Sequence, residues 1–355
     1  MYSKTKLERV LELHRGYDLP ERERKEGNVP IISSSGYSGL HNDCKCDGEN
    51  VITGRYGTIG EVFYHEGKCW PLNTALYVSD FKENNPKYVY YLLKYILKMS
   101  IDGKDKSTVP GVDRNVLHQM EIPFCQDIKE QKELIRILEK LDERIDLNRK
   151  INDNLLDSVQ AIFRSWFVDY DPFDGVCPSN WETGCVEDIA EFFDSMRKPL
   201  SSLERTDMER IYPYYGAVSI VDYVDDYIFD GEYLLVSEDG IYVVDENGHP
   251  LIQHISGKFW ANNHAHILKG KSGFNEDSLY LFLANTNMAP IVTGAAQPKI
   301  NQANLKSFPI TIPDSETMLK FNNIIQPFFD QRLTNESEIK KLEALQSLLL
   351  TRLVD

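Results

Sequence analysis

The residues from Leu134 to Trp166 read LIRILEKLDERIDLNRKINDNLLDSVQAIFRSW, and their apolar side chains recur in alternating steps of four and three. This spacing is a heptad repeat, which places one apolar stripe along a single face of a helix. No proline interrupts the stretch. A repeat sustained over about four heptads is typical of long helices that pack side by side. The stretch therefore predicts a long helix that has a partner.

A second stretch with the same spacing, Phe321 to Leu353, is the expected partner. Pro327 lies near its start and should kink or delay the helix. Polar residues interrupt both stripes near their middles, Asn148 and Asn152 in the first and Arg332 and Asn335 in the second. Polar seam positions of this kind weaken packing but fix register. The predicted apolar seam comprises Leu134, Leu138, Leu141, Ile145, Leu155, Ile162, Phe321, Ile325, Phe328, Ile339, Leu342 and Leu349. The alternative is that both are ordinary core helices, but a length near 40 residues, or ~60 Å, argues against it.

Each long helix follows a copy of one globular pattern. A Pro that opens a β-like run occurs at Pro30 and again at Pro213, and a Trp that precedes an Asn occurs at Trp70 and again at Trp260. Such matches are weak singly, but they keep the same order along the chain. An ordered internal repeat predicts two copies of one fold.

The expected organisation is a globular domain at 1–125, a helical spacer at 126–172, a second globular domain at 173–313 and a second helical spacer at 314–355. Within the domains, short β runs and one late helical stretch are expected. The β runs are Val51-Ile52, Val62–Tyr64, Leu76–Val78, Leu234–Val236 and Ile241–Val244, and the helical stretches are Tyr88–Met99 and Ser278–Asn285. The predicted fold class is α+β, with two similar domains, two long antiparallel helices and pseudo-two-fold symmetry.

Composition fits a globular protein, with 42% hydrophobic and 26% charged residues in a chain of 355. No apolar run reaches the ~18 residues that a membrane span needs, so we expect a cytoplasmic protein with reduced cysteines. The net charge is −16, of which −11 falls on residues 173–313, with 9 basic and 20 acidic groups. Such a charge is unfavourable for binding phosphates, so a partner should supply much of any positive surface.

Motifs for catalysis or metal binding are incomplete. His41, Cys44 and Cys46 could form half of a zinc site, but no second Cys/His pair has the required spacing. His264 and His266 share one face of a predicted strand without an evident third ligand. A phosphate-binding loop fails because Ala265 stands where its first Gly must be. We therefore expect no catalytic centre, no bound metal and no cofactor.

Three stretches resemble the specificity subunits of type I restriction–modification systems. The first is Gly54–Gly60 with Cys69–Ala75, the second is Ile122–Phe124 with Glu130–Ile135 and Leu138–Ile145, and the third is Phe163–Tyr170. The resemblance implies two target-recognition domains that each read one half-site of double-stranded DNA, with the helices as a ruler between them. It also implies that the helices dock two methyltransferase subunits, which restriction subunits join. S-adenosylmethionine, ATP and Mg²⁺ would then be bound by those partners. The alternative is a non-catalytic, two-headed scaffold or adaptor that does not bind nucleic acid.

Candidate DNA-binding residues are those whose side chains suit base edges or phosphates and which lie in equivalent predicted loops. In the first domain they are Ser33, Ser34, Ser35, Gly36, Tyr37, Arg55, Tyr56, Thr58, Lys104, Lys106, Ser107, Thr108, Arg114 and Asn115. In the second they are Tyr214, Tyr215, Lys258, Asn262, Asn263, Gln297, Lys299, Asn301 and Gln302. Each could instead be part of an ordinary solvated loop. Asn73 and Asn263 could cap turns, and both Trp70 and Trp260 are expected in the core.

Overall fold

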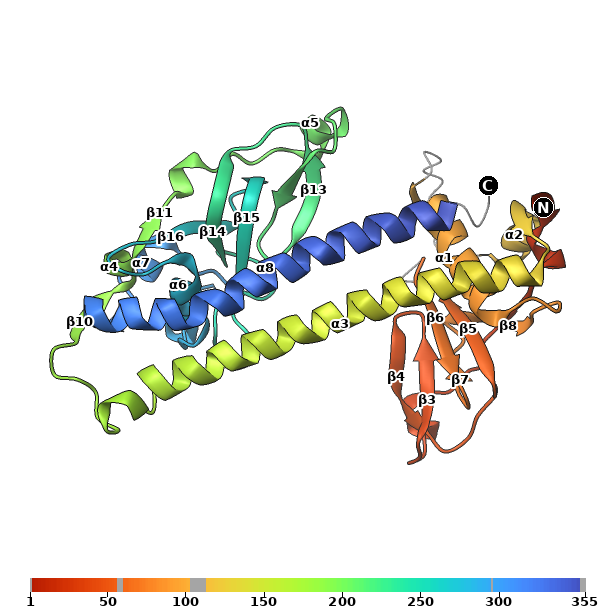
Figure 1. Cartoon of the computed structure of the whole chain (residues 1–355), viewed down its shortest axis with the longest axis horizontal. Coiled ribbons are helices and arrows are strands. Elements are labelled where there is room, and N and C mark those ends of the chain that lie inside the picture. The colour runs from red at the N-terminus through yellow and green to blue at the C-terminus, as the bar shows by residue number, and fades with distance from the viewer. Residues whose placement is uncertain (1, 56–59, 103–112, 295, 352–355) are drawn as a thin grey trace. The chain divides into compact units, whose positions relative to one another are not determined.

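The computed structural model describes residues 2–55, 60–102, 113–294 and 296–351. They form two compact units (Figure 1): unit 1 takes the described part of 1–149 and 336–355, and unit 2 takes 150–335. Two long helices, α3 (Ile128–Phe167) and α8 (Ser315–Thr351), each contribute one part to each unit. None of the described helices is both long and apolar enough to cross a membrane.

Unit 1 contains a four-stranded sheet of order β2-β8-β5-β6, a three-stranded sheet of order β4-β3-β7, and the antiparallel pair β1-β9. The strands are β1 (Tyr2–Lys6), β2 (Glu12–Arg15), β3 (Val29–Ser33), β4 (Gly36–His41), β5 (Glu49–Gly54), β6 (Val62–Glu66), β7 (Trp70–Pro71), β8 (Ala75–Asp80) and β9 (Glu121–Cys125). The helices are α1 (Pro86–Asp102) and α2 (Arg114–Gln119), with short 3₁₀ turns η1 (Leu7–Arg9) and η2 (Glu21–Glu23).

Unit 2 contains a six-stranded sheet of order β11-β16-β14-β15-β12-β13 and the antiparallel pair β10-β17. The strands are β10 (Glu182–Cys185), β11 (Ala190–Phe192), β12 (Tyr212–Tyr215), β13 (Ile220–Val224), β14 (Phe229–Ser237), β15 (Ile252–Ala261), β16 (Ala265–Gly270) and β17 (Pro309–Ile312). The helices are α4 (Val186–Ile189), α5 (Ser202–Thr206), α6 (Glu276–Ala284) and α7 (Gln302–Lys306), with 3₁₀ turns η3 (Asp171–Phe173), η4 (Asp194–Met196) and η5 (Ala289–Ile291).

The two units share one topology. The strand order β2-β8-β5-β6 recurs as β11-β16-β14-β15, and β4-β3-β7 recurs as β13-β12-β15. In both, the strand opened by proline runs parallel to the strand that carries the tryptophan: Ile31 lies opposite Trp70, and Tyr214 lies opposite Trp260. The main difference is that β15 is continuous where unit 1 has the separate strands β6 and β7. The predicted internal repeat is therefore confirmed at the level of strand register.

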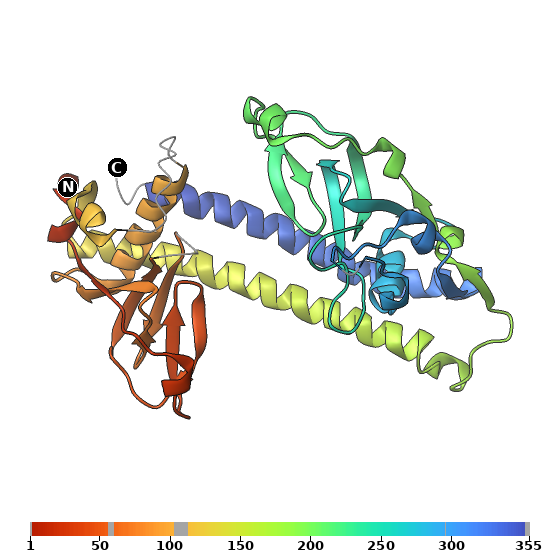
Figure 2. The ribbon, with the colours of Figure 1, turned by 180° about the vertical axis from the view of Figure 1, so that it is seen from behind.

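The long helices complete the core of each unit. In unit 1, α1 packs against β5 and β6, and Leu138 and Leu350 of the long helices join the same apolar cluster. In unit 2, α6 packs against β14, β15 and β16 (Figure 2), and Phe163 and Phe321 join its cluster. Trp70 and Trp260 are buried, as expected. Burial of apolar area is the main favourable term in folding, so neither core is complete without both helices.

The two long helices run antiparallel where they meet inside each unit. In unit 1, Asp142 accepts a hydrogen bond from Gln346, and in unit 2 the ring of Phe163 lies against that of Phe321. Asn152 and Asn335 are both buried, and Asn335 Nδ2 donates to Asn152 Oδ1 at 2.8 Å. Every residue of the predicted apolar seam is buried or half-buried. The two buried amides are thus hydrogen-bonded to each other where the long helices meet in unit 2.

Two expectations about local structure are wrong. Helix α8 begins at Ser315 and continues through Pro327, so the proline does not delay the helix. Ile241–Val244 form no strand, although Val244 makes an isolated bridge to Pro250. The chain turns at Gly240, with φ +149°, so Ile241–Val244 leave the line of β14. They cannot pair with β14 itself, because β15 and β16 already occupy both of its sides.

The buried amide pair gives a test of the helix contact in unit 2. Asn335→Leu leaves Asn152 without its buried donor and should lower the free energy of unfolding by about 1–3 kcal/mol. The double variant Asn152→Leu/Asn335→Leu should recover most of this loss, because an apolar pair leaves no polar group unsatisfied. Urea unfolding of the wild type, both single variants and the double variant measures the coupling. Strictly additive effects would contradict the pairing.

Candidate nucleic-acid interface

Four turns of unit 1 meet at one end of its sheets. They are Gly16–Asp18 after β2, Ser33–Gly36 after β3, Arg55 after β5, and Leu72–Thr74 before β8. The Ser34 backbone N–H donates to Thr74 Oγ1 at 3.4 Å, and the Arg55 N–H donates to the Thr74 carbonyl at 2.9 Å. The Asn73 N–H donates to the Tyr17 carbonyl at 3.0 Å. We call this arrangement the turn cluster of unit 1.

The turn cluster contains several of the predicted DNA-binding residues. Ser34 is half-buried and Ser35 is exposed, so both can present a hydroxyl group. Ser33 is buried and donates to the carbonyl of Gly36, itself buried, which makes Ser33 a turn residue rather than a reader. Arg55 is half-buried at the edge of the cluster.

Tyr37 directly follows the turn Ser33–Gly36, and its hydroxyl is 3.0 Å from His65 Nδ1. With Tyr64, Tyr90 and Asp142 it lines a cavity of about 300 Å³.

Other predicted residues of the first domain lie elsewhere or outside the described residues. Arg114 and Asn115 are exposed at the start of α2, which packs against η1 and β2, and the backbone of Asn115 donates to the N-cap Asp113. Six residues lie outside the described part of the chain: Tyr56, Thr58, Lys104, Lys106, Ser107 and Thr108.

Sequence reasoning missed a cationic residue beside the cluster. Lys45 Nζ lies 4.6 Å from the centre of the Trp70 ring and 5.5 Å from that of Tyr17. The hydroxyl groups of Tyr17 and Tyr77 are 2.9 Å apart. Lys45 and Tyr17 belong to no motif and are far from Trp70 in the sequence, so only the fold could bring the three together.

The equivalent four turns meet in unit 2. The Asn262 N–H donates to the Tyr215 carbonyl at 3.0 Å, and the Glu238 N–H donates to the His264 carbonyl at 2.9 Å. Arg197 Nη1 donates to the Ala265 carbonyl at 2.7 Å. A fifth segment, Gln297–Gln302, joins them because the Ile300 N–H donates to the Glu238 carbonyl at 2.8 Å. This is the turn cluster of unit 2.

Five of the predicted residues of the second domain belong to this turn cluster and are not fully buried. Asn263 and Gln297 are exposed, and Lys299, Asn301 and Gln302 are half-buried. Asn301 also caps α7, since its side chain accepts from the Asn304 N–H. Asn262, also in the cluster, is buried and its Oδ1 accepts from the His264 N–H at 2.8 Å, which makes it a turn residue.

Three predicted residues of the second domain are placed less favourably. Tyr214 is only 2% exposed, and its hydroxyl accepts from the Leu200 N–H, so it belongs to the core and cannot face a base. Tyr215 is half-buried and packs edge-on against Phe259. Lys258 lies on β15 with its Nζ 4.4 Å from the Tyr227 ring, away from the turns.

A charge reversal distinguishes the two clusters. In unit 1, Arg15 pairs with Asp18 three residues later, and both side chains are more than half exposed. At the equivalent positions of unit 2, Asp194 pairs with Arg197, and both are largely buried. The same backbone frame therefore holds a solvated ion pair in one unit and a buried one in the other.

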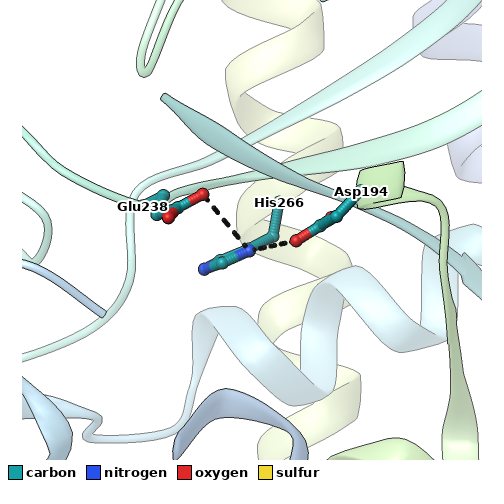
Figure 3. Close-up of side chains that lie close together, drawn as sticks. All are labelled: Asp194, Glu238 and His266. Atoms are coloured by element: carbon teal, nitrogen blue, oxygen red, sulfur yellow. Dashed lines mark hydrogen bonds and ion pairs between the residues drawn. The ribbon is translucent and has the colours of Figure 1, made fainter. Parts of the chain in front are cut away.

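The buried pair belongs to an ion network around His266 (Figure 3), whose side chain has no exposed surface. His266 Nδ1 lies 2.6 Å from Asp194 Oδ2, and Nε2 lies 2.8 Å from the Ile300 carbonyl oxygen. The ring therefore bridges a side-chain carboxyl group and a backbone carbonyl, and both of its nitrogens have a hydrogen-bond partner. Arg197 Nη1 donates to Glu238 Oε2 at 2.5 Å, and Lys299 Nζ lies 2.8 Å from Glu238 Oε1.

Asp194, Glu238 and His266 also have the spacing of a metal site, with ligand atoms within 4.8 Å of one another. A metal ion binds the lone pair of a neutral imidazole nitrogen. Here both ring nitrogens are already engaged in hydrogen bonds within the protein, and both carboxylates are paired with cationic groups. The cluster is therefore better explained as an ion network that ties the turns of unit 2 together.

The network lowers the pKa of both carboxyl groups. Burial raises the pKa of Asp194, but the hydrogen bond from His266 and the nearby positive charges outweigh it, so the pKa is lowered from 3.8. Burial likewise raises the pKa of Glu238, and hydrogen bonds from Lys299 and Arg197 reverse the effect, so the pKa is lowered from 4.5. A carboxyl group with a lowered pKa stabilises the fold above its ordinary pKa and loses that effect as pH falls through the lowered value.

Unit 2 should therefore lose stability in acid through this network. Asp194→Asn should lower the free energy of unfolding at pH 7 by about 3–5 kcal/mol, because it breaks a buried ion network. It should also flatten the decline in stability below about pH 4. Denaturant unfolding between pH 3 and 8, followed by tryptophan fluorescence, measures both effects. Asp18→Asn is the matched exposed control and should leave the pH profile unchanged. Equal profiles for wild type and Asp194→Asn would show that the network is not stabilising.

Comparison with known proteins gives the family. The family model described as the type I restriction modification DNA specificity domain matches twice, over residues 2–157 and 178–345. A Haemophilus influenzae protein assigned to the type I restriction enzyme specificity subunits is 39% identical over 128 residues, which are 36% of this chain and 32% of that protein. The type I restriction enzyme MjaIX specificity subunit of Methanocaldococcus jannaschii is 24% identical over 296 residues, 76% of this chain and 68% of that protein.

The fold also has a solved counterpart. The crystal structure of the type I restriction–modification system S subunit from M. genitalium matches with a TM-score of 0.58 at 17% identity, covering 100% of this chain and 96% of that one. The match confirms the predicted α+β class with long helices and repeated domains. The matched chain segment spans about a third of the Haemophilus relative and about two thirds of the archaeal one. The two matches of the family model, one to each copy of the repeat, show that the chain belongs to the type I restriction–modification DNA specificity subunits.

Proposed function

We propose that each unit reads one half-site of a bipartite double-stranded DNA target through its turn cluster. The observation that carries this proposal is the recurrence of one turn cluster, on one topology, with different side chains. Arg55 in unit 1 is replaced by Glu238 in unit 2 at the position after the equivalent strand. A shared frame with changed side chains is what two readers of different sequences require, because base edges are distinguished by side-chain donors and acceptors.

The helices are proposed as the spacer and as the docking surface for two methyltransferase subunits, with restriction subunits joining that complex. Modules held by a stiff spacer read half-sites at a fixed separation. S-adenosylmethionine, ATP and Mg²⁺ are proposed to bind to those partners, and this chain acts in recognition rather than catalysis. We also propose a cytoplasmic location, because the proposed target is DNA. The adaptor alternative is supported only by the acidic charge, and the family assignment favours the DNA reader.

Exchange of one domain tests the two-reader arrangement. Replacing residues 1–125 with the corresponding domain of another family member should change one half of the methylated target and leave the other half intact. The reciprocal exchange of residues 173–313 should change only the other half. Single-molecule sequencing of methylated bases in cells that carry each chimera measures the result. An unchanged target, or a change in both halves, would contradict the proposal.

The charge distribution predicts that the chain binds DNA weakly by itself. Residues 1–125 carry no net charge and residues 173–313 carry −11, so few phosphates can be neutralised. Addition of the cognate methyltransferase should increase the affinity for a duplex with the target and produce a clear preference over a scrambled duplex. Gel shift at two salt concentrations measures both quantities. Tight, selective binding by the chain alone would show that no partner is needed.

A further inference from the structure

The loop Glu238–Val243 of unit 2 is held at both ends. Glu238 is fixed at the first end by Arg197 and Lys299. Val243 is buried at the second end, where its carbonyl accepts from the Leu251 N–H at 3.1 Å. The residues between these two anchors therefore form a short tip on a fixed base.

Two bulky apolar side chains occupy that tip. Ile241 is 83% exposed and Tyr242 is 72% exposed. Adjacent exposed apolar side chains on an anchored loop are costly in water and are typical of a surface that a partner covers. Their predicted strand would have buried part of this surface, but the chain forms no strand there.

The tip belongs to the turn cluster of unit 2. The Glu238 N–H donates to the His264 carbonyl, and Asp239 forms an isolated β-bridge with Lys299. The exposed amides Asn263 and Gln297 lie on the two segments that these contacts join to the loop. The tip therefore projects from the surface that carries the candidate base readers.

This surface has little positive charge to offer. The cationic groups of Arg197 and Lys299 are both paired with Glu238. Asp239 is paired with His264, and the exposed amides Asn263 and Gln297 suit base edges but do not neutralise phosphates. A net charge of −11 on residues 173–313 adds repulsion. Unit 2 must obtain its DNA affinity mainly from contacts other than ion pairs.

We infer that Ile241 and Tyr242 form an apolar wedge that inserts at one base step of the half-site read by unit 2. The inference rests on the proposed function and names how this unit binds. Apolar side chains inserted between base pairs bind without positive charge, and the step must unstack to admit them. Pyrimidine–purine steps unstack most easily, so the wedge should favour DNA that has such a step at the insertion point. This preference requires no hydrogen bond to the base edges.

Affinity measurements test the wedge in the complex of the chain with its methyltransferase on the duplex identified by methylated-base sequencing. Tyr242→Ala should weaken binding about tenfold or more, the scale of loss when an aromatic stacking partner is removed. The slope of log affinity against log salt should stay unchanged, because no phosphate contact is lost. Tyr242→Phe retains the ring and should bind like the wild type. Leu203→Ala is the control, since Leu203 is equally exposed, at 81%, on α5.

A fluorescence measurement tests insertion with the wild type itself. 2-Aminopurine placed at each step of the half-site in turn should brighten at one step when the wild-type complex binds, and should not brighten with Tyr242→Ala. Wild-type affinity for Tyr242→Ala, a changed salt slope, or no brightening at any step would overturn the wedge. If the wild-type complex prefers no duplex at all, the proposed function itself fails, so the two failures are distinguishable.

Discussion

The structure depends on a shared apolar contact between two helices that lie far apart in the sequence. Leu138 of α3 and Leu350 of α8 enter the core of unit 1, and Phe163 and Phe321 enter that of unit 2. Each globular pattern is therefore incomplete until both helices are present. Each long helix contributes the same periodic apolar face to both cores. The clearest pattern in the sequence is therefore a heptad repeat and not a motif for a catalytic or binding site.

With the frame fixed in this way, the turns can vary. Every strand of unit 1 has a counterpart in unit 2, yet the ion pair after the first sheet strand is reversed in sign and changes from exposed to buried. A buried ion pair is rarely a large source of stability, but it fixes geometry because any rearrangement exposes an unpaired charge to the interior. The network around His266 thus gives unit 2 rigid turns, whereas the ion pair of unit 1 remains solvated.

The sequence predicted the long-range periodic features better than the local contacts. The heptads and the ordered repeat extend over many residues, so single errors do not obscure them. Ile241–Val244 has the composition of a strand, but the chain turns at Gly240 directly after β14, whose two sides are already paired, and only the fold shows that. Tyr214 is a predicted DNA-binding residue and yet lies in the core. Asp194 and His266 are 72 residues apart, and no sequence motif predicts their contact.

An acidic domain that reads DNA poses a physical problem, and the arrangement of charges in unit 2 indicates its solution. Its carboxylates at the turn cluster do not face outward unpaired; Glu238 is held by Arg197 and Lys299, and Asp239 by His264. The two cationic groups on Glu238 neutralise its charge locally without making the surface basic. Sequence discrimination by neutral amides and apolar contacts needs no surplus positive charge, whereas binding to any duplex does. In the proposed complex, the partner supplies affinity for the DNA duplex and this chain discriminates between base sequences. The two tasks are then separable, as a subunit dedicated to specificity requires.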